Sequence, residues 1–237
     1  MIELCLPAGG LWGINLTGAL KSLKEKGFTP DVITGVSSGA HAAYLVYSGA
    51  NHETMVSWFE DARRHMASQK IKRFLPPYDS GGEQLQGLIR PYTVDNKTFQ
   101  DQGIKKFYVG FTKLPYFSFE VENILQGCHH KGALTILKSS TIPFCTHFGF
   151  HMKGALDGGF RKTNFNAPVS KTKRRVLLTY TGPYGRLTES FGGPYDMIIR
   201  VKPSFRHPLL ARSKDLKRGL EDGCNQGRVI DFLSTLK

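Results

Sequence analysis

Short apolar runs alternate with helical segments along the first fifty residues. Residues 2–6 form an apolar run that ends at Pro7, and a second run covers residues 32–34, so each predicts a buried strand. Both runs lead into glycines and then into a helix. The second helix, residues 40–46, is rich in alanine, and the first ends before Gly27, a typical C-terminal cap. The apolar face of that first helix consists of Leu16, Ala19, Leu20 and Leu23.

The remainder of the chain continues this alternation. Asn51 is a suitable N-cap for an amphipathic helix, and Ser213 is expected to cap a final helix in which three glycines weaken the helical pattern. A further helical stretch covers residues 130–138. The β-like runs are residues 106–112, 116–122, 176–181 and 196–201. The apolar positions of the two helices are Met55, Trp58, Ala62 and Met66, and then Leu216, Leu220, Val229 and Phe232; the three glycines are Gly219, Gly223 and Gly227.

Alternating strands and helices predict a largely parallel sheet covered on both faces, which is a three-layer α/β/α sandwich. We expect a single domain over residues 1–237, because the sequence has no repeat, low-complexity tract or linker. Residues 69–102 are rich in Pro, Gly and polar residues, which predicts an insertion or lid rather than core. No apolar run approaches the roughly 20 residues of a membrane-spanning helix, and the N-terminus lacks the basic region of a signal peptide.

The composition is that of a globular protein, with 40% hydrophobic and 22% charged residues. The four cysteines are far apart and form no C-x-x-C pair, which predicts reduced thiols in a cytoplasmic protein. His147 and His151 are four residues apart, but Phe148-Gly149-Phe150 between them favours a turn or extended segment over a helix. We therefore expect no metal site and no cofactor.

Positive charge is concentrated in the last third of the sequence. The formal net charge is +13, and residues 161–237 hold 16 Lys and Arg against 6 Asp and Glu. A basic C-terminal part predicts an anionic partner, and a phospholipid surface, a nucleic acid and an acidic protein all satisfy this condition. No nucleic-acid-binding motif accompanies the charge, so we expect no nucleic-acid partner.

One short motif indicates nucleophilic catalysis. Residues 35–39 read G-V-S-S-G and match the G-x-S-x-G pattern, between a predicted strand and a predicted helix. A serine on such a tight turn requires neighbours without Cβ atoms, which Gly35 and Gly39 provide. Ser37 is then the candidate nucleophile, and the helix N-terminus behind it favours developing negative charge. The alternative interpretation is an ordinary capped helix start.

Two further glycine motifs lie at strand ends. Residues 8–13, A-G-G-L-W-G, follow the first strand, where paired backbone N–H groups can receive the charge of an oxyanion. A phosphate-binding loop is the rival interpretation, but the glycine spacing fits neither of the common nucleotide-binding patterns. Asp157-Gly158-Gly159 is by itself an ordinary turn, and it gains chemical meaning only if Asp157 reaches Ser37.

Together these motifs resemble the patatin-like phospholipase family. The glycine-rich loop with its helix, the elbow at residues 35–40, the segment Ser139–Phe144 and the turn at Asp157 occur in the family's order, and the turn leads into Asn166-Ala167-Pro168-Val169. The resemblance covers about residues 2–170. Each motif is modest, and their joint occurrence in this order is specific.

The resemblance implies a lipid acyl hydrolase with a Ser–Asp dyad and no histidine. In this sequence the nucleophile is Ser37, and the base is Asp157 in the turn formed with Gly158 and Gly159. It also implies a phospholipid or other acyl-lipid substrate. The basic C-terminal part predicts peripheral contact with an anionic membrane, while the oligomeric state stays open. The oxyanion loop implied by the resemblance consists of Gly9, Gly10 and Leu11.

The loop departs from the family pattern at two positions, and two alternatives remain. Ala8 replaces the first glycine, and Trp12 replaces a basic residue and so removes a cation from the loop. A triad would require His207, the only histidine after Asp157. A non-catalytic protein that binds anionic membranes or nucleic acid through its basic part would show no ester turnover.

Overall fold

The computed structural model describes residues 1–72, 94–143, 151–168 and 174–230. Within these ranges one sheet has the strand order β4-β3-β2-β1-β6-β7, and β5 also pairs with β3. Strands β1, β2, β3, β6 and β7 are parallel, whereas β4 and β5 run antiparallel to β3. The strands are β1 (Ile2–Leu6), β2 (Val32–Val36), β3 (Lys106–Lys113), β4 (Ser118–Asn123), β5 (Ala155–Asp157), β6 (Arg174–Tyr180) and β7 (Met197–Val201).

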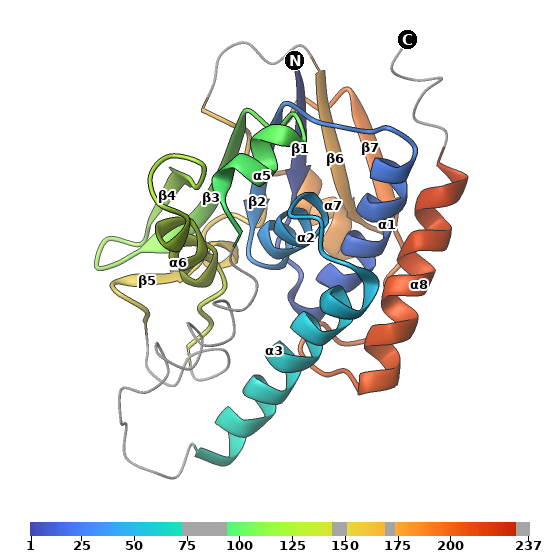
Figure 1. Ribbon diagram of the computed structural model, residues 1–237. Helices are drawn as coiled ribbons and strands as arrows, with labels where there is room; N and C mark the ends of the chain where they lie inside the picture. The colour runs from blue at the N-terminus through green and yellow to red at the C-terminus, as the bar shows by residue number, and fades with distance from the viewer. Residues whose placement is uncertain (73–93, 144–150, 169–173, 231–237) are drawn as a thin grey trace.

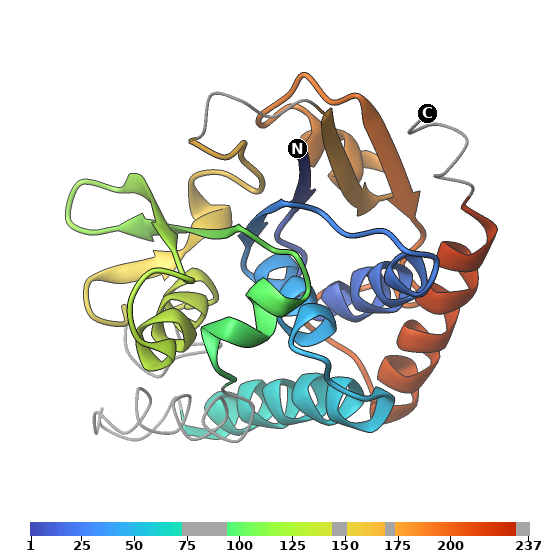
Figure 2. The ribbon, with the colours of Figure 1, turned by 45° about the horizontal axis from the view of Figure 1, so that its top comes forward.

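Helices cover both faces of this sheet, as expected for an α/β protein. In Figures 1 and 2, α1, α2, α3 and α8 lie on one face and α7 lies on the other. No helix in the described part of the chain is long and apolar enough to cross a membrane. The helices are α1 (Gly13–Glu25), α2 (Ser38–Tyr47), α3 (His52–Lys72), α5 (Asn96–Asp101), α6 (His129–Ser139), α7 (Pro183–Glu189) and α8 (Ser213–Val229), with short 3-10 turns η1 (Gly10–Trp12) and η3 (Gly158–Phe160).

The strands and long helices predicted from the sequence are confirmed, and three short elements were missed. Strand β5 has three residues, and α5 and α7 have six and seven residues, so none offers a full apolar period. Helix α5 lies within residues 69–102, which were expected to form an insertion or lid rather than core. Its Phe99 is buried and packs against Tyr44 and Phe107, with ring centroids 5.2 and 6.1 Å apart. That end of the stretch belongs to the core, α3 continues to Lys72, and residues 73–93 lie outside the described residues.

Strand β3 has two partners along one edge. Its residues 106–110 pair with β2, and its residues 111–113 pair with β5, while β4 occupies the opposite edge. The last residue of β2, Val36, is opposite Gly110, and the last residue of β5, Asp157, is opposite Phe111. Both strands therefore end at neighbouring positions of β3, which brings the residues at their ends together.

The three glycines of α8 explain how this helix packs. A Cβ at Gly223 would lie 3.0 Å from the Asn15 carbonyl carbon and 3.1 Å from the Ala19 nitrogen, and Gly18 of α1 faces α8 in the same way. The glycines that weaken the helical pattern thus allow the two backbones to approach closely. The N-cap residue is Arg212, whose N–H donates to Asp215 Oδ2 at 2.8 Å, and not Ser213 as expected. Leu216 and Leu220 are buried, Val229 is exposed, and Phe232 lies outside the described residues.

Adding a methyl group at this contact should destabilise the fold. We expect Gly223→Ala to lower the free energy of unfolding by about 1–3 kcal/mol, because the overpacked helices must separate. Urea unfolding followed by circular dichroism measures this change. Glu221→Ala, at an exposed position of the same helix, should change stability by no more than about 0.5 kcal/mol. Equal effects of the two substitutions would contradict close packing at Gly223.

Candidate active site

Ser37 lies on a sharp turn between β2 and α2. Its φ of 50° and ψ of −125° are unusual for a residue with a side chain, as expected at a nucleophile elbow. The two flanking glycines have no room for a side chain. A Cβ at Gly35 would lie 2.7 Å from the Ala40 Cα, and one at Gly39 would lie 2.6 Å from the Pro7 carbonyl oxygen. The glycines of the motif are therefore required by the turn itself.

The shared edge of β3 brings Ser37 and Asp157 into contact. The Ser37 hydroxyl donates a hydrogen bond to Asp157 Oδ2 at 2.6 Å, although 120 residues separate the two in sequence. Both side chains are buried, each with 5% of its surface exposed. Contact in a site with little water favours proton transfer between the two groups during a reaction.

The Asp157 carboxylate is oriented by its own turn. Its Oδ1 accepts a hydrogen bond from the Gly159 N–H at 2.7 Å, which leaves Oδ2 directed at Ser37. The main chain of Asp157 is held as well, because its N–H donates to the Thr141 carbonyl at 2.7 Å and its carbonyl accepts from Thr112 Oγ1 at 3.0 Å. Burial raises the pKa of Asp157 to about 6, while the hydrogen bonds from Ser37 and Gly159 lower it.

Ser139 fastens the elbow to β3. The Ser37 N–H donates to Ser139 Oγ at 2.7 Å, and Ser139 Oγ donates to the Gly110 carbonyl at 2.6 Å. Ser139 is fully buried at the end of α6. Sequence reasoning placed it in a family motif without assigning it a role. Its contacts suggest that it stabilises the strained backbone at Ser37.

Of the three N–H groups expected to form an oxyanion loop, that of Leu11 has an acceptor within the protein. The Leu11 N–H donates to the Pro208 carbonyl at 2.6 Å, so it is engaged within the protein. In the described part of the chain, the N–H groups of Gly9 and Gly10 donate to no acceptor, and the same holds for Ser38 at the start of α2. The signal for Ser38 was its position directly after the nucleophile.

Trp12 belongs to an aromatic cluster behind this loop. Its ring lies 5.7 Å from the Tyr180 ring and 5.9 Å from the Tyr184 ring, and its Nε1–H donates to the Phe205 carbonyl at 2.8 Å. The Tyr184 hydroxyl donates to the Ala8 carbonyl at 2.9 Å. The position that is basic in the family is therefore used here for packing that supports the loop.

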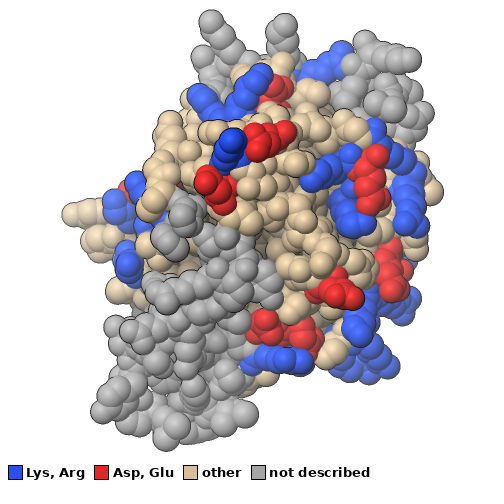
Figure 3. Space-filling view, viewed as in Figure 1, with Lys and Arg blue, Asp and Glu red and all other residues tan. Residues whose placement is uncertain are grey.

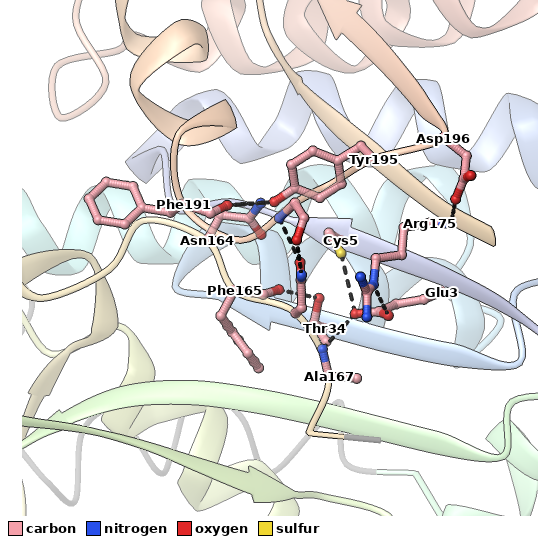
Figure 4. Close-up of polar contacts among 12 residues, drawn as sticks. Glu3, Cys5, Thr34, Asn164, Phe165, Ala167, Arg175, Phe191, Tyr195 and Asp196 are labelled. Atoms are coloured by element: carbon pink, nitrogen blue, oxygen red, sulfur yellow. Dashed lines mark hydrogen bonds and ion pairs between the residues drawn. The ribbon is translucent and has the colours of Figure 1, made fainter. Parts of the chain in front are cut away.

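The segment that follows the Asp157 turn is tied to the centre of the sheet. Figure 4 shows Glu3, fully buried on β1, accepting the Ala167 N–H at 2.6 Å and pairing with Arg175 at 3.0 Å. Thr34 Oγ1 donates to the Phe165 carbonyl at 3.0 Å. A buried ion pair of this kind stabilises only while both partners are present. It fixes the path of the chain that leaves Asp157.

No histidine completes a triad in the described residues. The hydrogen-bond donors to the Asp157 carboxylate there are Ser37 and Gly159, and His207 is an exposed residue whose Nδ1 accepts the Leu209 N–H at 3.2 Å. His41 lies on α2 one turn after Ser37 and is hydrogen-bonded to Ser140. Burial lowers the pKa of His41 to about 4, so its ring is neutral near pH 7.

The described residues hold no cluster of side chains that could bind a metal ion. No group of three His, Cys, Asp or Glu side chains that could hold a metal ion occurs there. Of the histidine pair considered from the sequence, His147 lies outside the described residues. Cys5, Cys128 and Cys224 are free thiols, and Cys145 is also outside the described ranges.

Fold and site together define a mixed α/β protein with a serine elbow beside a buried carboxylate. The model of the patatin-like phospholipase family matches residues 4–169, and the chain belongs to this family. VipD from Legionella pneumophila has a similar fold, with 13% identity and a TM-score of 0.57 over 95% of this chain and 65% of VipD.

A second solved structure is that of ExoU with SpcU, from the type III secretion system of Pseudomonas aeruginosa. It has 15% identity and a TM-score of 0.46 over 100% of this chain and 52% of the matched chain. This chain thus spans between about half and two thirds of these structural relatives. No curated protein sequence is similar enough to count as a match.

Burial of Asp157 should affect stability as well as chemistry. Its pKa is about 6 in the folded protein against 3.8 for the free group, so the folded state retains a proton that the unfolded chain releases between these values. The stabilisation from protonated Asp157 is therefore lost as pH rises through this window. We expect Asp157→Asn to be more stable than the unsubstituted protein at about pH 7, by roughly 1–3 kcal/mol.

Urea unfolding at about pH 4 and pH 7 measures this difference, which should nearly vanish at the lower pH. Asp101→Asn, at an exposed position, is the control for loss of a carboxylate. A stability difference for Asp157→Asn that is the same at both pH values would contradict the raised pKa.

Proposed function

We propose that this chain is a lipid acyl hydrolase that cleaves fatty-acyl esters of phospholipids or other glycerolipids. The observation that carries the proposal is the 2.6 Å hydrogen bond from the Ser37 hydroxyl to a buried Asp157 carboxylate. Membership of the patatin-like phospholipase family supports the substrate class. Ser37 is the nucleophile in this proposal, and Asp157 is both general base and general acid.

The reaction divides into two steps. Ser37 Oγ attacks the ester carbonyl while its proton passes to Asp157 Oδ2, and the tetrahedral intermediate collapses as Asp157 returns the proton to the departing alcohol. Water then attacks the acyl-serine and gives one proton to Asp157. Collapse of this second intermediate returns that proton to Ser37 and releases the fatty acid. A carboxylate with a pKa of about 6 is closer to the working pH than an ordinary aspartate, which suits it to both transfers.

Backbone N–H groups provide the electrostatic stabilisation in this scheme. Gly9, Gly10 and Ser38 have unengaged N–H groups within the described residues, on two segments that begin a helix or helical turn. Such donors are effective because they need no reorganisation when charge develops on the carbonyl oxygen. Leu11 is left out of the set, since its N–H is bound to Pro208.

Removing either member of the dyad should abolish turnover. We expect Ser37→Ala and Asp157→Asn each to lower kcat on a long-chain fatty-acyl ester by roughly 10³-fold or more. His207→Ala should retain activity, because this exposed side chain makes no contact with Asp157. Mass spectrometry after treatment with a fluorophosphonate should find the adduct on Ser37. Full activity of Asp157→Asn would contradict the dyad.

The pH profile offers an independent check on the base. Because attack requires ionised Asp157, kcat/KM should rise with pH and level off above a midpoint of about 6. Steady-state assays on a soluble ester between about pH 4 and 8 measure this midpoint. A rate that does not change across this range would argue against Asp157 as the base.

Contact with a lipid surface is proposed for the end of the β3–β4 hairpin. Lys and Arg do not form a continuous patch over α1 and α8, where Figure 3 shows both signs of charge interspersed. The hairpin end instead carries Tyr116 and Phe117, which are 89% and 48% exposed. The Leu114 N–H donates to the Gly154 carbonyl at 2.8 Å, which places exposed Lys153 beside this hairpin end. Aromatic rings with neighbouring cations suit an anionic membrane interface.

Vesicle sedimentation tests this contact. We expect Tyr116→Ser with Phe117→Asn to weaken binding to phosphatidylglycerol vesicles about tenfold, because apolar burial worth roughly 1.4 kcal/mol is lost. Asparagine is chosen at position 117 because the φ of Phe117 is positive and asparagine tolerates a positive φ better than most residues. Val229→Ser, at an equally exposed apolar position on α8, should leave binding unchanged. Equal losses for both variants would exclude the hairpin as the docking site.

A further inference from the structure

Two hydroxyl groups close to the glycine-rich loop are buried without hydrogen-bond partners. In the described residues, neither the Tyr180 hydroxyl nor Ser38 Oγ has a partner of adequate geometry. By contrast, the hydroxyl of the fully buried Tyr47 donates a hydrogen bond to the Phe28 carbonyl at 3.3 Å. Burying a hydroxyl without a partner destabilises a protein, so such groups in a native structure call for an explanation.

Both hydroxyls pack against the backbone that carries the oxyanion donors. Tyr180 is the last residue of β6, and a Cβ at Gly9 would overlap its hydroxyl and ring. Ser38 packs against the start of α1, where a Cβ at Gly13 would lie 2.6 Å from the Ser38 Cβ. Burial raises the pKa of Tyr180, and proximity to the Ser38 hydroxyl lowers it, so the two hydroxyls lie near each other although their geometry falls short of a hydrogen bond.

The aromatic cluster holds Tyr180 from its other side. Its ring lies 5.7 Å from Trp12 and 5.9 Å from Tyr184, and Tyr184 is itself bonded to the Ala8 carbonyl at 2.9 Å. The Tyr180 ring is thus clamped between these aromatic side chains and the loop at Gly9. The Tyr180 hydroxyl therefore has a defined position beside Gly9 and near the side chain of Ser38.

We propose that Tyr180 and Ser38 are positioning residues whose facing hydroxyls set the separation between the Gly9–Gly10 N–H groups and the Ser38 N–H. This inference rests on the proposed function. The pair does not touch the substrate in this proposal, since both hydroxyl oxygens are buried. It keeps the two donor segments at the spacing that a tetrahedral oxyanion requires, and the pair closes into a hydrogen bond when that oxyanion forms. Donors fixed in this way stabilise the transition state more than the bound ester.

Removing the Tyr180 hydroxyl should lower kcat without lowering the melting temperature. We expect Tyr180→Phe to lower kcat roughly tenfold with KM unchanged, which is less than the ~100-fold or greater loss of a direct oxyanion donor. The rate at which a fluorophosphonate labels Ser37 should fall by a similar factor. The melting temperature should stay the same or rise, because the lost hydroxyl made no hydrogen bond. Ser38→Ala should act alike, and the double variant should lose little more than either single one.

Tyr47→Phe is the matched control. It removes a hydroxyl that does have a partner, so it should lower the melting temperature and leave kcat and the labelling rate unchanged. Unchanged kcat in Tyr180→Phe, with Ser37 still labelled, would overturn the positioning role alone. A loss of kcat matched by a loss of melting temperature, as for a merely structural tyrosine, would overturn it too. Failure of the unsubstituted protein to label at Ser37 would overturn the proposed function and this inference together.

Discussion

The whole site depends on how one edge of β3 is divided between two strands. Strand β2 pairs with its first half and ends opposite Gly110, and β5 pairs from the opposite direction and ends opposite Phe111. Backbone hydrogen bonds of the sheet, rather than flexible side chains, therefore set the approach of Ser37 and Asp157. A shift of either strand by one residue would turn its side chains to the other face and separate the two groups.

Hydrogen bonds near this edge of β3 compensate for the strained backbone at Ser37 and for the burial of the Asp157 carboxylate. A positive φ at Ser37 costs on the order of 1–3 kcal/mol, and the carboxylate of Asp157 is withdrawn from water. Ser139 anchors the elbow backbone to β3, while Gly159 supplies the carboxylate with a donor in place of solvent. Burial thereby gives Asp157 a raised pKa, which an exposed aspartate would not have.

Much of this arrangement could be predicted from the sequence, because local patterns determine most of it. The elbow at Ser37, the turn at Asp157 and the long elements each have a strong local signal. Strand β5 has only three residues, so its pairing depends on the tertiary structure. The engagement of Leu11 by Pro208 was equally hidden, since it joins positions 197 residues apart. The glycines of α8 weakened the helix prediction for the same reason, because they are needed for close packing against α1, which lies far away in the sequence.

The hydrogen bond between Leu11 and Pro208 joins the glycine-rich loop to the C-terminal third of the chain. Pro208 lies beyond residues 4–169, which the family model matches, as do β6, β7 and α8, yet it is bonded to the glycine-rich loop beside Ser37. The C-terminal third therefore supports the backbone of the glycine-rich loop and is also a source of surface charge. A substitution in the C-terminal third that shifts Pro208 would displace the Leu11 backbone without altering any residue of the motifs at Ser37 and Asp157.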